Sequence, residues 1–108
     1  MITAKEAEHI LRPVKVQHAF QLHMGASIHS LKEMAEALDL MAEKSFQHHV
    51  SESRNDFSNW VKDVLGDDEL AATIHSLRNR EAILKKIDDR IEQLERKMAE
   101  SHVTTKEL

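Results

Sequence analysis

The stretch from Phe46 to Ala71, FQHHVSESRNDFSNWVKDVLGDDELA, constrains the fold of this 108-residue chain more than any other part of it. Its apolar residues recur at i, i+3, i+4, i+7 and i+8, which is the spacing of one face of an α-helix. Asn55 and Asp56 are residue types that begin helices, and Gly66 is the type that ends them. The segment therefore predicts a helix whose buried face consists of Phe57, Trp60, Val61, Val64 and Leu65.

The composition favours a small helical protein. A length of 108 residues fits one domain plus an extension, and two Gly with one Pro suit long helices better than sheets. The net charge of −4 disfavours nonspecific attraction to nucleic-acid phosphates. Because the chain has no Cys, disulfides, thiolate metal sites and cysteine nucleophiles are excluded.

The sequence shows no sign of membrane insertion. No apolar run approaches the roughly 20 residues that a membrane-spanning helix needs. The first residues, MITAKEAEHILRP, lack the basic and apolar regions of a signal peptide. We therefore expect a cytoplasmic protein with no membrane contact.

Two further segments carry the start signals of helices. Thr3 and Glu6 have the spacing of a capping box for a short helix within residues 1–13. Ser30 and Glu33 repeat this spacing before a second helix. The apolar residues that the second helix is expected to bury are Leu31, Met34, Ala35, Leu38 and Met41.

The segment between these helices has a different pattern. Apolar and polar residues alternate over residues 14–22, which is typical of a half-buried strand. Gly25 permits a tight turn, and residues 26–28 are long enough for a minimal return strand. We therefore expect a small β-hairpin.

The phase of the apolar stripe slips between Leu40 and Ser45, which indicates a bend or a break before a short helix that carries Phe46 and Val50. That helix would form a helical hairpin with the helix that contains Trp60. The expected fold class is an α-rich α+β fold, a small helical domain with a possible β-hairpin and a long C-terminal coiled-coil helix.

Aromatic, acidic and glycine positions form a larger pattern over residues 20–80. The pattern consists of Phe20, Gly25, SLKEMAEAL at residues 30–38, FQHHV, NDFSNWVKDVLGD and LA. It resembles a small prokaryotic domain family of unknown function with an NDFxxWxxDVxGD motif. The resemblance covers over half of the chain and implies a folded unit there, but it implies no known activity, substrate or ligand.

The last third of the chain has a heptad pattern. Residues 67–69 are acidic and suit the start of one long helix, whose macrodipole favours negative charge there. From position 84 the apolar residues occupy a and d positions of a coiled coil, with charged residues at the edges, including Arg90 and Glu95. Antiparallel packing within the chain is the alternative, because it produces the same spacing. The predicted interaction residues are Leu84, Ile87, Ile91, Leu94 and Met98.

Taken together, the predicted helices, the hairpin and the heptad pattern divide the chain into three segments. Residues 1–13 form an N-terminal helix, residues 14–80 a helical domain with a possible hairpin, and residues 81–108 a C-terminal coiled-coil extension.

The sequence contains eight His residues, which are its candidates for metal binding or catalysis. A metal site needs three or four converging ligands, which usually include an i, i+4 pair on a helix, and no two of these His residues have that spacing. His48 or His49 could combine with Asp56, and His18 or His23 could join them. The favoured interpretation is that the histidines are capping, surface or satisfied core residues, so we expect no metal, no cofactor and no catalytic residue.

Two other patterns have both a chemical and a structural interpretation. Asp56 and Asp63 are two turns apart on one helical face, as a carboxylate pair of a hydrolase could be, but the sequence outlines no substrate groove. The favoured interpretation is that Asp56 caps the helix and Asp63 faces solvent or pairs with a basic residue. Trp60 could stack on a nucleotide, but its place in the apolar stripe favours the core.

The leading functional hypothesis is a non-enzymatic protein–protein interaction or regulatory module that forms a homodimer through its C-terminal helix. The alternative is a nucleic-acid-binding dimer with a helix-turn-helix-like region, although the net acidity opposes it. A His-based metal-dependent enzyme is the third hypothesis. The phosphate contacts of the nucleic-acid alternative would be Lys32, Lys44, Arg54 and Lys62.

Overall fold

The computed structural model describes the backbone of residues 2–107 and the side chains of residues 2–100. This part of the chain contains helices, a 3-10 turn (η1), a π-helical turn (η2) and one small antiparallel sheet, so the predicted α-rich α+β fold is confirmed. In chain order the elements are α1 (Ala4–Leu11), η1 (Val16–His18), β1 (Phe20–Gln21), β2 (Ser27–Ile28), α2 (Leu31–Leu40), α3 (Glu43–His49), α4 (Asp56–Trp60), η2 (Val61–Leu65), α5 (Asp68–His75) and α6 (Arg80–Glu107).

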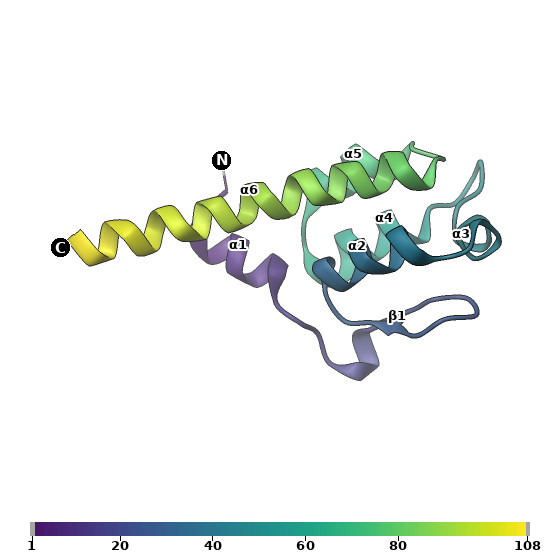
Figure 1. The fold of residues 1–108 in the computed structure, drawn as a ribbon, viewed down its shortest axis with the longest axis horizontal. Helices are drawn as coiled ribbons and strands as arrows, with labels where there is room; N and C mark the ends of the chain where they lie inside the picture. Colours follow the sequence, from purple (N-terminus) through teal and green to yellow (C-terminus); the bar gives the residue numbers. More distant parts are fainter. Residues whose placement is uncertain (1, 108) are drawn as a thin grey trace.

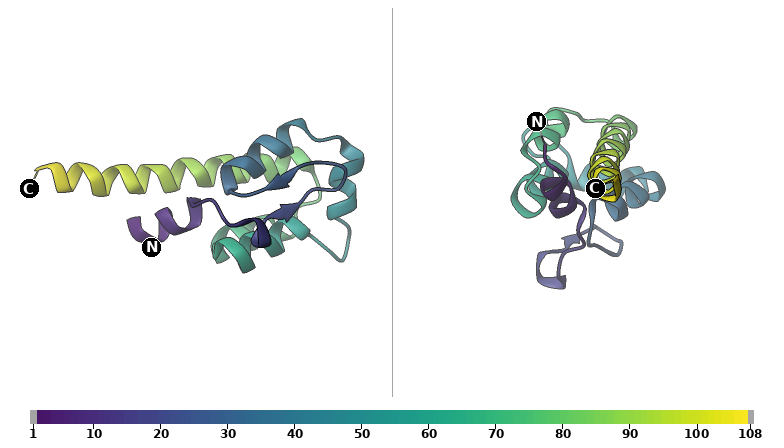
Figure 2. Two further views of the ribbon diagram at one scale, coloured as in Figure 1. Left: turned by 90° about the horizontal axis from the view of Figure 1, so that it is seen from below. Right: turned by 90° about the vertical axis from the view of Figure 1, so that its left-hand side faces the viewer.

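The long helix α6 determines the elongated shape of the molecule, which measures 51 × 26 × 23 Å (Figure 1). Helices α1 and α2 pack along α6, and the C-terminal turns of α6 extend past α1 (Figure 1). Viewed along α6, the hairpin and η1 lie on the far side of the other helices (Figure 2). The hairpin and η1 therefore form the side of the fold opposite α6 (Figures 1 and 2).

One hydrophobic core joins the N-terminal helix, the central region and the long helix. Ala7 and Ile10 of α1 belong to the same buried cluster as Ile83, Ile87 and Leu94 of α6. The three expected segments 1–13, 14–80 and 81–108 therefore share one core. Its central members are Phe20, Ile28, Leu31, Met34, Leu38, Phe46, Phe57, Trp60, Val61, Leu65, Leu70 and Ile74.

The helix starts follow the predicted capping chemistry. The Glu6 amide donates to the Thr3 hydroxyl, and the Thr3 amide donates to the Glu6 carboxylate, so the capping box of α1 is complete. These bonds from Thr3 to the carboxylate lower the pKa of Glu6. At α2 the Glu33 amide donates to the Ser30 hydroxyl, but the Glu33 carboxylate accepts from the His29 amide instead of the Ser30 amide.

The predicted strand over residues 14–22 is wrong for most of its length. Only Phe20 and Gln21 pair with the return strand, opposite Ile28 and Ser27. Val16 lies in η1 and is 70% exposed, because the chain before Phe20 has no partner strand to form a ladder with. The alternation of apolar and polar residues therefore does not correspond to a half-buried strand there.

The hairpin loop places a methionine in a conformation that favours glycine. Met24 has φ 59°, and its side chain is 83% exposed. Gly25 serves a close approach, since a Cβ at this position would lie 2.7 Å from Cδ2 of Leu22. The left-handed residue of the turn is therefore Met24, which is strained by its backbone conformation.

The helix predicted from the NDFSNW stretch is confirmed. Asn55 is its N-cap and accepts a hydrogen bond from the Ser58 amide at 3.0 Å. The helix continues from α4 into η2, and Gly66, with φ 79°, ends it in the left-handed conformation. Of the predicted stripe, Val64 is only partly buried.

The expected single helix from residue 67 onwards is wrong, because it is divided into α5 and α6 by residues 76–79. The buried Asn55 amide group donates to the carbonyls of Ile74 and His75 at 2.9 and 3.3 Å, which satisfies the C-terminal end of α5. Asn79 begins α6 by accepting from the Ala82 amide at 2.9 Å. Two asparagines therefore define a break that the heptad spacing does not reveal.

The double role of Asn55 leads to a prediction about stability. Asn and Asp are usually equivalent N-caps, but Asn55→Asp would place a carboxylate oxygen against the carbonyls of Ile74 and His75 in the buried site. We expect a loss of about 2–4 kcal/mol in the free energy of unfolding, measured by chemical denaturation. Asn79→Asp is the matched control, since this exposed cap has no such carbonyl contacts and should tolerate the change. Equal losses in the two variants would contradict this account.

Candidate functional site

The apolar seam predicted as a dimer interface is covered by the chain itself. Ile87 and Leu94 are 0% exposed, while Leu84, Ile91 and Met98 are partly buried against the core. Helices α1 and α2 are the main neighbours of α6. Packing within the chain, which was the alternative, therefore accounts for the heptad spacing, and the structure does not support a coiled coil built on these residues.

The charged edges of the seam are also paired within the chain. Arg90 forms a buried, bidentate ion pair with Asp67, with N–O distances of 2.8 and 2.9 Å. Burial lowers the pKa of Arg90, but the hydrogen bonds and charge of Asp67 outweigh it and raise the pKa, so the guanidinium stays charged. Glu95 pairs with Lys32 of α2. These charges orient α6 on its own domain.

The polar and aromatic residues of the NDFSNW stretch are directed toward other parts of the chain. Asn55 binds the end of α5, Asp56 binds His49, and the Trp60 indole N–H donates to the carbonyl of His18 at 2.8 Å. Phe57 lies in the core and stacks on Phe20 with ring centroids 4.9 Å apart. The motif therefore joins the hairpin region, α3 and α5 around one short helix, which is a structural role.

His49 is the most fully bonded histidine of the motif region. Its Nδ1 lies 2.9 Å from Oδ2 of Asp56, and its Nε2 lies 2.9 Å from the backbone nitrogen of His23. A backbone N–H can only donate, so Nε2 accepts and Nδ1 carries the ring proton that is donated to Asp56. Because both nitrogens are occupied, His49 has no free position for a metal ion or for proton transfer to a substrate.

The histidines considered as metal ligands do come close together, but not as a ligand set. The His23 and His48 rings stack with centroids 3.8 Å apart, and the His48 ring stands edge-on to His49 at 5.1 Å. His18 is exposed and lies in η1. Within the described residues, no group of three or more His, Asp or Glu side chains has the arrangement of a metal site.

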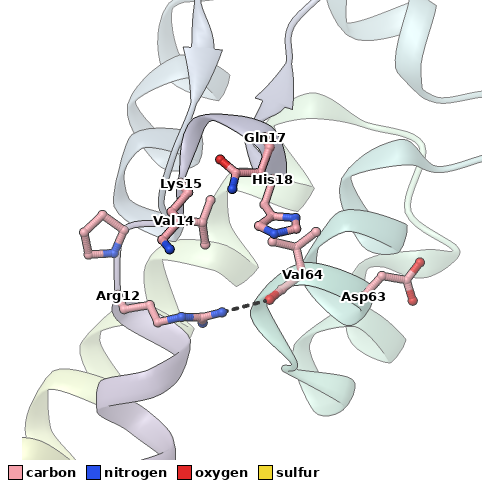
Figure 3. A pocket seen from close by; sticks show the side chains of 8 residues that line it. Arg12, Val14, Lys15, Gln17, His18, Asp63 and Val64 are labelled. Atoms are coloured by element: carbon pink, nitrogen blue, oxygen red, sulfur yellow. Dashed lines mark hydrogen bonds between the residues drawn. The ribbon is translucent and has the colours of Figure 1, made fainter.

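A hollow of about 430 Å³ lies between the linker after α1 and the end of η2 (Figure 3). Arg12 donates from Nη2 to the Val64 carbonyl at 3.3 Å and from Nη1 to the His9 carbonyl at 2.6 Å, so it joins α1 to η2. Lys15 and Asp63 also line this hollow. Asp63 is thus separate from Asp56, and the two do not share a site as a carboxylate pair.

The four basic residues of the nucleic-acid hypothesis do not form one free patch. Lys32 is paired with Glu95, and Arg54 is paired with Asp56 and donates to the carbonyl of His48. Lys44 lies in the first turn of α3, whereas Lys62 lies in η2. This arrangement does not offer the continuous basic surface that phosphate binding needs.

Two large apolar side chains are strongly exposed beside one groove, which lies next to the hairpin. Met24 and Leu40 are both 83% exposed, and both line a groove of about 430 Å³ between the hairpin loop and the α2–α3 connection. We call this groove the hairpin groove. Its lining residues are Leu22, Met24, Gly25, Ala37, Leu40, Met41, Ala42, Lys44 and Ser45.

Comparison of the chain with protein-family models, with curated proteins and with solved structures finds no match. The resemblance to the NDFxxWxxDVxGD family therefore rests on the sequence pattern of residues 20–80 alone. In the part of the chain that the structure describes, no helix has the length and apolar character needed to cross a membrane.

The sequence did not single out the hairpin groove. Met24 stands between His23 and Gly25, whereas Leu40 lies between Asp39 and Met41, and the fold brings the two together from a loop and a helix end. The only available signals were a methionine beside Gly25 and a leucine at the point where the apolar stripe of α2 loses its phase. Neither signal indicates exposure by itself.

Proposed function

We propose that this chain is a non-enzymatic protein–protein interaction module that forms a homodimer through the hairpin groove. The observation that carries the proposal is the exposure of Met24 and Leu40, each 83%, in one apolar groove of a chain whose other apolar stripe is already covered. Exposed apolar patches of this kind mark contact surfaces in soluble proteins. The absence of Cys suits the cytoplasm as the compartment.

A second copy of the chain is the occupant that the shape of the patch favours. A two-fold contact uses the same surface on both subunits, so that surface must be complementary to itself. The hairpin groove combines protruding side chains, Met24 and Leu40, with a hollow beside them. Each copy can thus insert its exposed side chains into the groove of the other.

The charges around the groove support the same occupant. Lys44 lies at the groove, while Glu36 and Asp39 are exposed on α2 beside Leu40. None of these three side chains belongs to an ion pair among residues 2–100. In a two-fold arrangement Lys44 of one copy would face the acidic side chains of the other, as electrostatic complementarity requires.

Sedimentation equilibrium tests this proposal. We expect the native chain to be a dimer at about 100 micromolar, and Leu40→Lys and Met24→Gly to weaken the dimer more than tenfold, because each change occurs twice in the interface. Both residues are exposed, and Gly suits the left-handed conformation at position 24, so the fold should be retained. Val16→Lys is the matched control, since Val16 is another exposed apolar residue, 70%, outside the groove.

Two results would contradict the proposal. The first is a native chain that is monomeric at this concentration, because such a chain would not form the proposed homodimer. A dimer that is lost in Met98→Lys but retained in Leu40→Lys uses α6 instead of the hairpin groove, because Met98 lies at the partly buried edge of that helix.

A further inference from the structure

His49 connects the hairpin groove to the interior of the fold. It lies at the end of α3, its Nδ1 binds Asp56 at the start of α4, and its Nε2 accepts from the amide of His23. His23 immediately precedes Met24, which lines the groove. A single buried side chain therefore holds the loop that forms one wall of the groove.

The bond from His23 exists in only one protonation state of His49. A neutral imidazole has one donor and one acceptor, whereas a protonated ring has two donors and no acceptor. After protonation of Nε2, the ring N–H would face the His23 N–H, and a buried donor would be left without a partner. The arrangement therefore requires a neutral ring.

We propose that His49 is an acid-sensitive latch, in which protonation of Nε2 releases the His23 amide and frees the hairpin loop that carries Met24. The link between this latch and dimer formation rests on the proposed function. The release of the loop is independent of it. The strained, left-handed backbone of Met24 favours the release, since a freed loop can leave this conformation. Histidine is the residue type that changes charge most readily between about pH 5 and 8, and the latch is tested over this range.

The groups around His49 influence this transition in opposite directions. The Asp56 carboxylate favours the charged ring, while Arg54, whose Nε lies 3.4 Å from Oδ1 of Asp56, reduces that effect. Phe20 and Phe57, with centroids 4.9 and 5.4 Å from His49, exclude water and disfavour the charge.

Two other histidines face the same loop. The His48 ring is edge-on to His49, and the His23 ring stacks on His48 at a centroid distance of 3.8 Å. If both stacked rings became protonated, their repulsion would also release the loop. The experiment must therefore separate His49 from this pair.

Nitrogen-15 NMR of the full chain from pH 8 to pH 5 provides the test. At pH 8 we expect the His49 ring to carry its proton on Nδ1 and the His23 amide to be protected from hydrogen exchange. As the ring takes up its second proton, the protection factor of the His23 amide should fall on the order of tenfold with the same midpoint. Core amides such as that of Ile87 should stay protected.

Three variants assign the effect. His49→Phe fills the space of the ring without its nitrogens and should leave the His23 amide unprotected at every pH. His48→Gln removes the stacked pair and should retain the transition. Asp56→Asn removes the counter-charge but keeps an acceptor for Nδ1–H, so the midpoint should move to lower pH. This last variant tests the latch even if His49→Phe does not fold.

Several outcomes would overturn the latch. These are a proton on Nε2 at pH 8, a His23 amide that stays protected after the ring has titrated, or an Asp56→Asn midpoint that does not fall. Loss of the transition in His48→Gln would assign it to the stacked pair instead.

The dissociation constant of the dimer, measured at pH 7.5 and 5.5, separately tests whether the latch affects the hairpin groove. We expect association of the native chain to weaken about fivefold or more at the lower pH if the loop forms the interface. A chain that is monomeric at both pH values would refute the proposed function, while the amide measurements would still decide the latch. A dimer that is equally strong at both values, with a released loop, would show that the latch does not regulate the groove.

Discussion

Arg90→Met is expected to lower the free energy of unfolding by about 3–5 kcal/mol, because it leaves the carboxylate of Asp67 buried without its counter-ion. The two side chains are 6% and 1% exposed, and the guanidinium donates to both carboxylate oxygens. In the variant, Asp67 would retain the Leu70 amide as a donor, since it caps α5. Chemical denaturation measured by circular dichroism gives the loss.

Two further variants separate charge burial from other causes. The double variant Asp67→Asn with Arg90→Met should recover at least half of the loss, because Asn keeps the cap of α5 without a buried charge. Lys85→Met is the matched control on α6, since Lys85 forms an exposed i, i+4 pair with Asp89 at 3.0 Å and should change little. If Arg90→Met costs no more than Lys85→Met, α6 does not lie on α5 as the structure has it.

The parts of the fold that were predictable from sequence are those determined by neighbouring residues. The side chains of Thr3, Ser30 and Asn55 each accept a hydrogen bond from the amide three residues later and so begin a helix. Gly66 ends a helix by its own backbone conformation. These signals lie within one or two turns of the elements they define. Their agreement over a short stretch explains why the NDFSNW helix was placed correctly.

What was missed depends on contacts between distant residues. A heptad pattern records which residues of a helix are covered, but not by which surface, and here the cover is α1 and α2. Arg90 was interpreted as a charged residue at the edge of a coiled coil, because its partner, Asp67, lies 23 residues earlier. Asp67 was interpreted only as an acidic residue at the start of a helix. The division between α5 and α6 likewise depends on Asn55, which is about 20 residues from the carbonyls it binds.

The histidines show the same limit at the candidate site. The sequence offered either His48 or His49 as a possible neighbour of Asp56 in a metal site, and the structure has the contact between His49 and Asp56. The bond from the His23 amide to Nε2 spans 26 residues and depends on the path of the hairpin. Because of that bond, His49 holds the loop and is not free to act as a metal ligand or a base. The spacing of side chains in the sequence carries no information about a backbone donor.

Trp60→Ala is expected to cost about 3–5 kcal/mol in the free energy of unfolding, as truncations of buried aromatic side chains do. The ring is buried, its edge meets Phe20 at a centroid distance of 6.1 Å, and its N–H donates to the His18 carbonyl. Removing the ring therefore leaves a cavity between α4 and the hairpin region and an unsatisfied carbonyl. A loss of this size is a large fraction of the stability of so small a domain.

Trp60→Phe separates these two contributions. Phenylalanine keeps most of the ring volume but cannot donate to His18, so the loss should be only about 1–2 kcal/mol. Chemical denaturation of both variants, followed by circular dichroism because the only Trp is removed, measures the difference. If Trp60→Ala loses less than about 1 kcal/mol, the scale of a surface substitution, the ring is not part of the core, and its use as a stacking surface for a ligand becomes the better explanation.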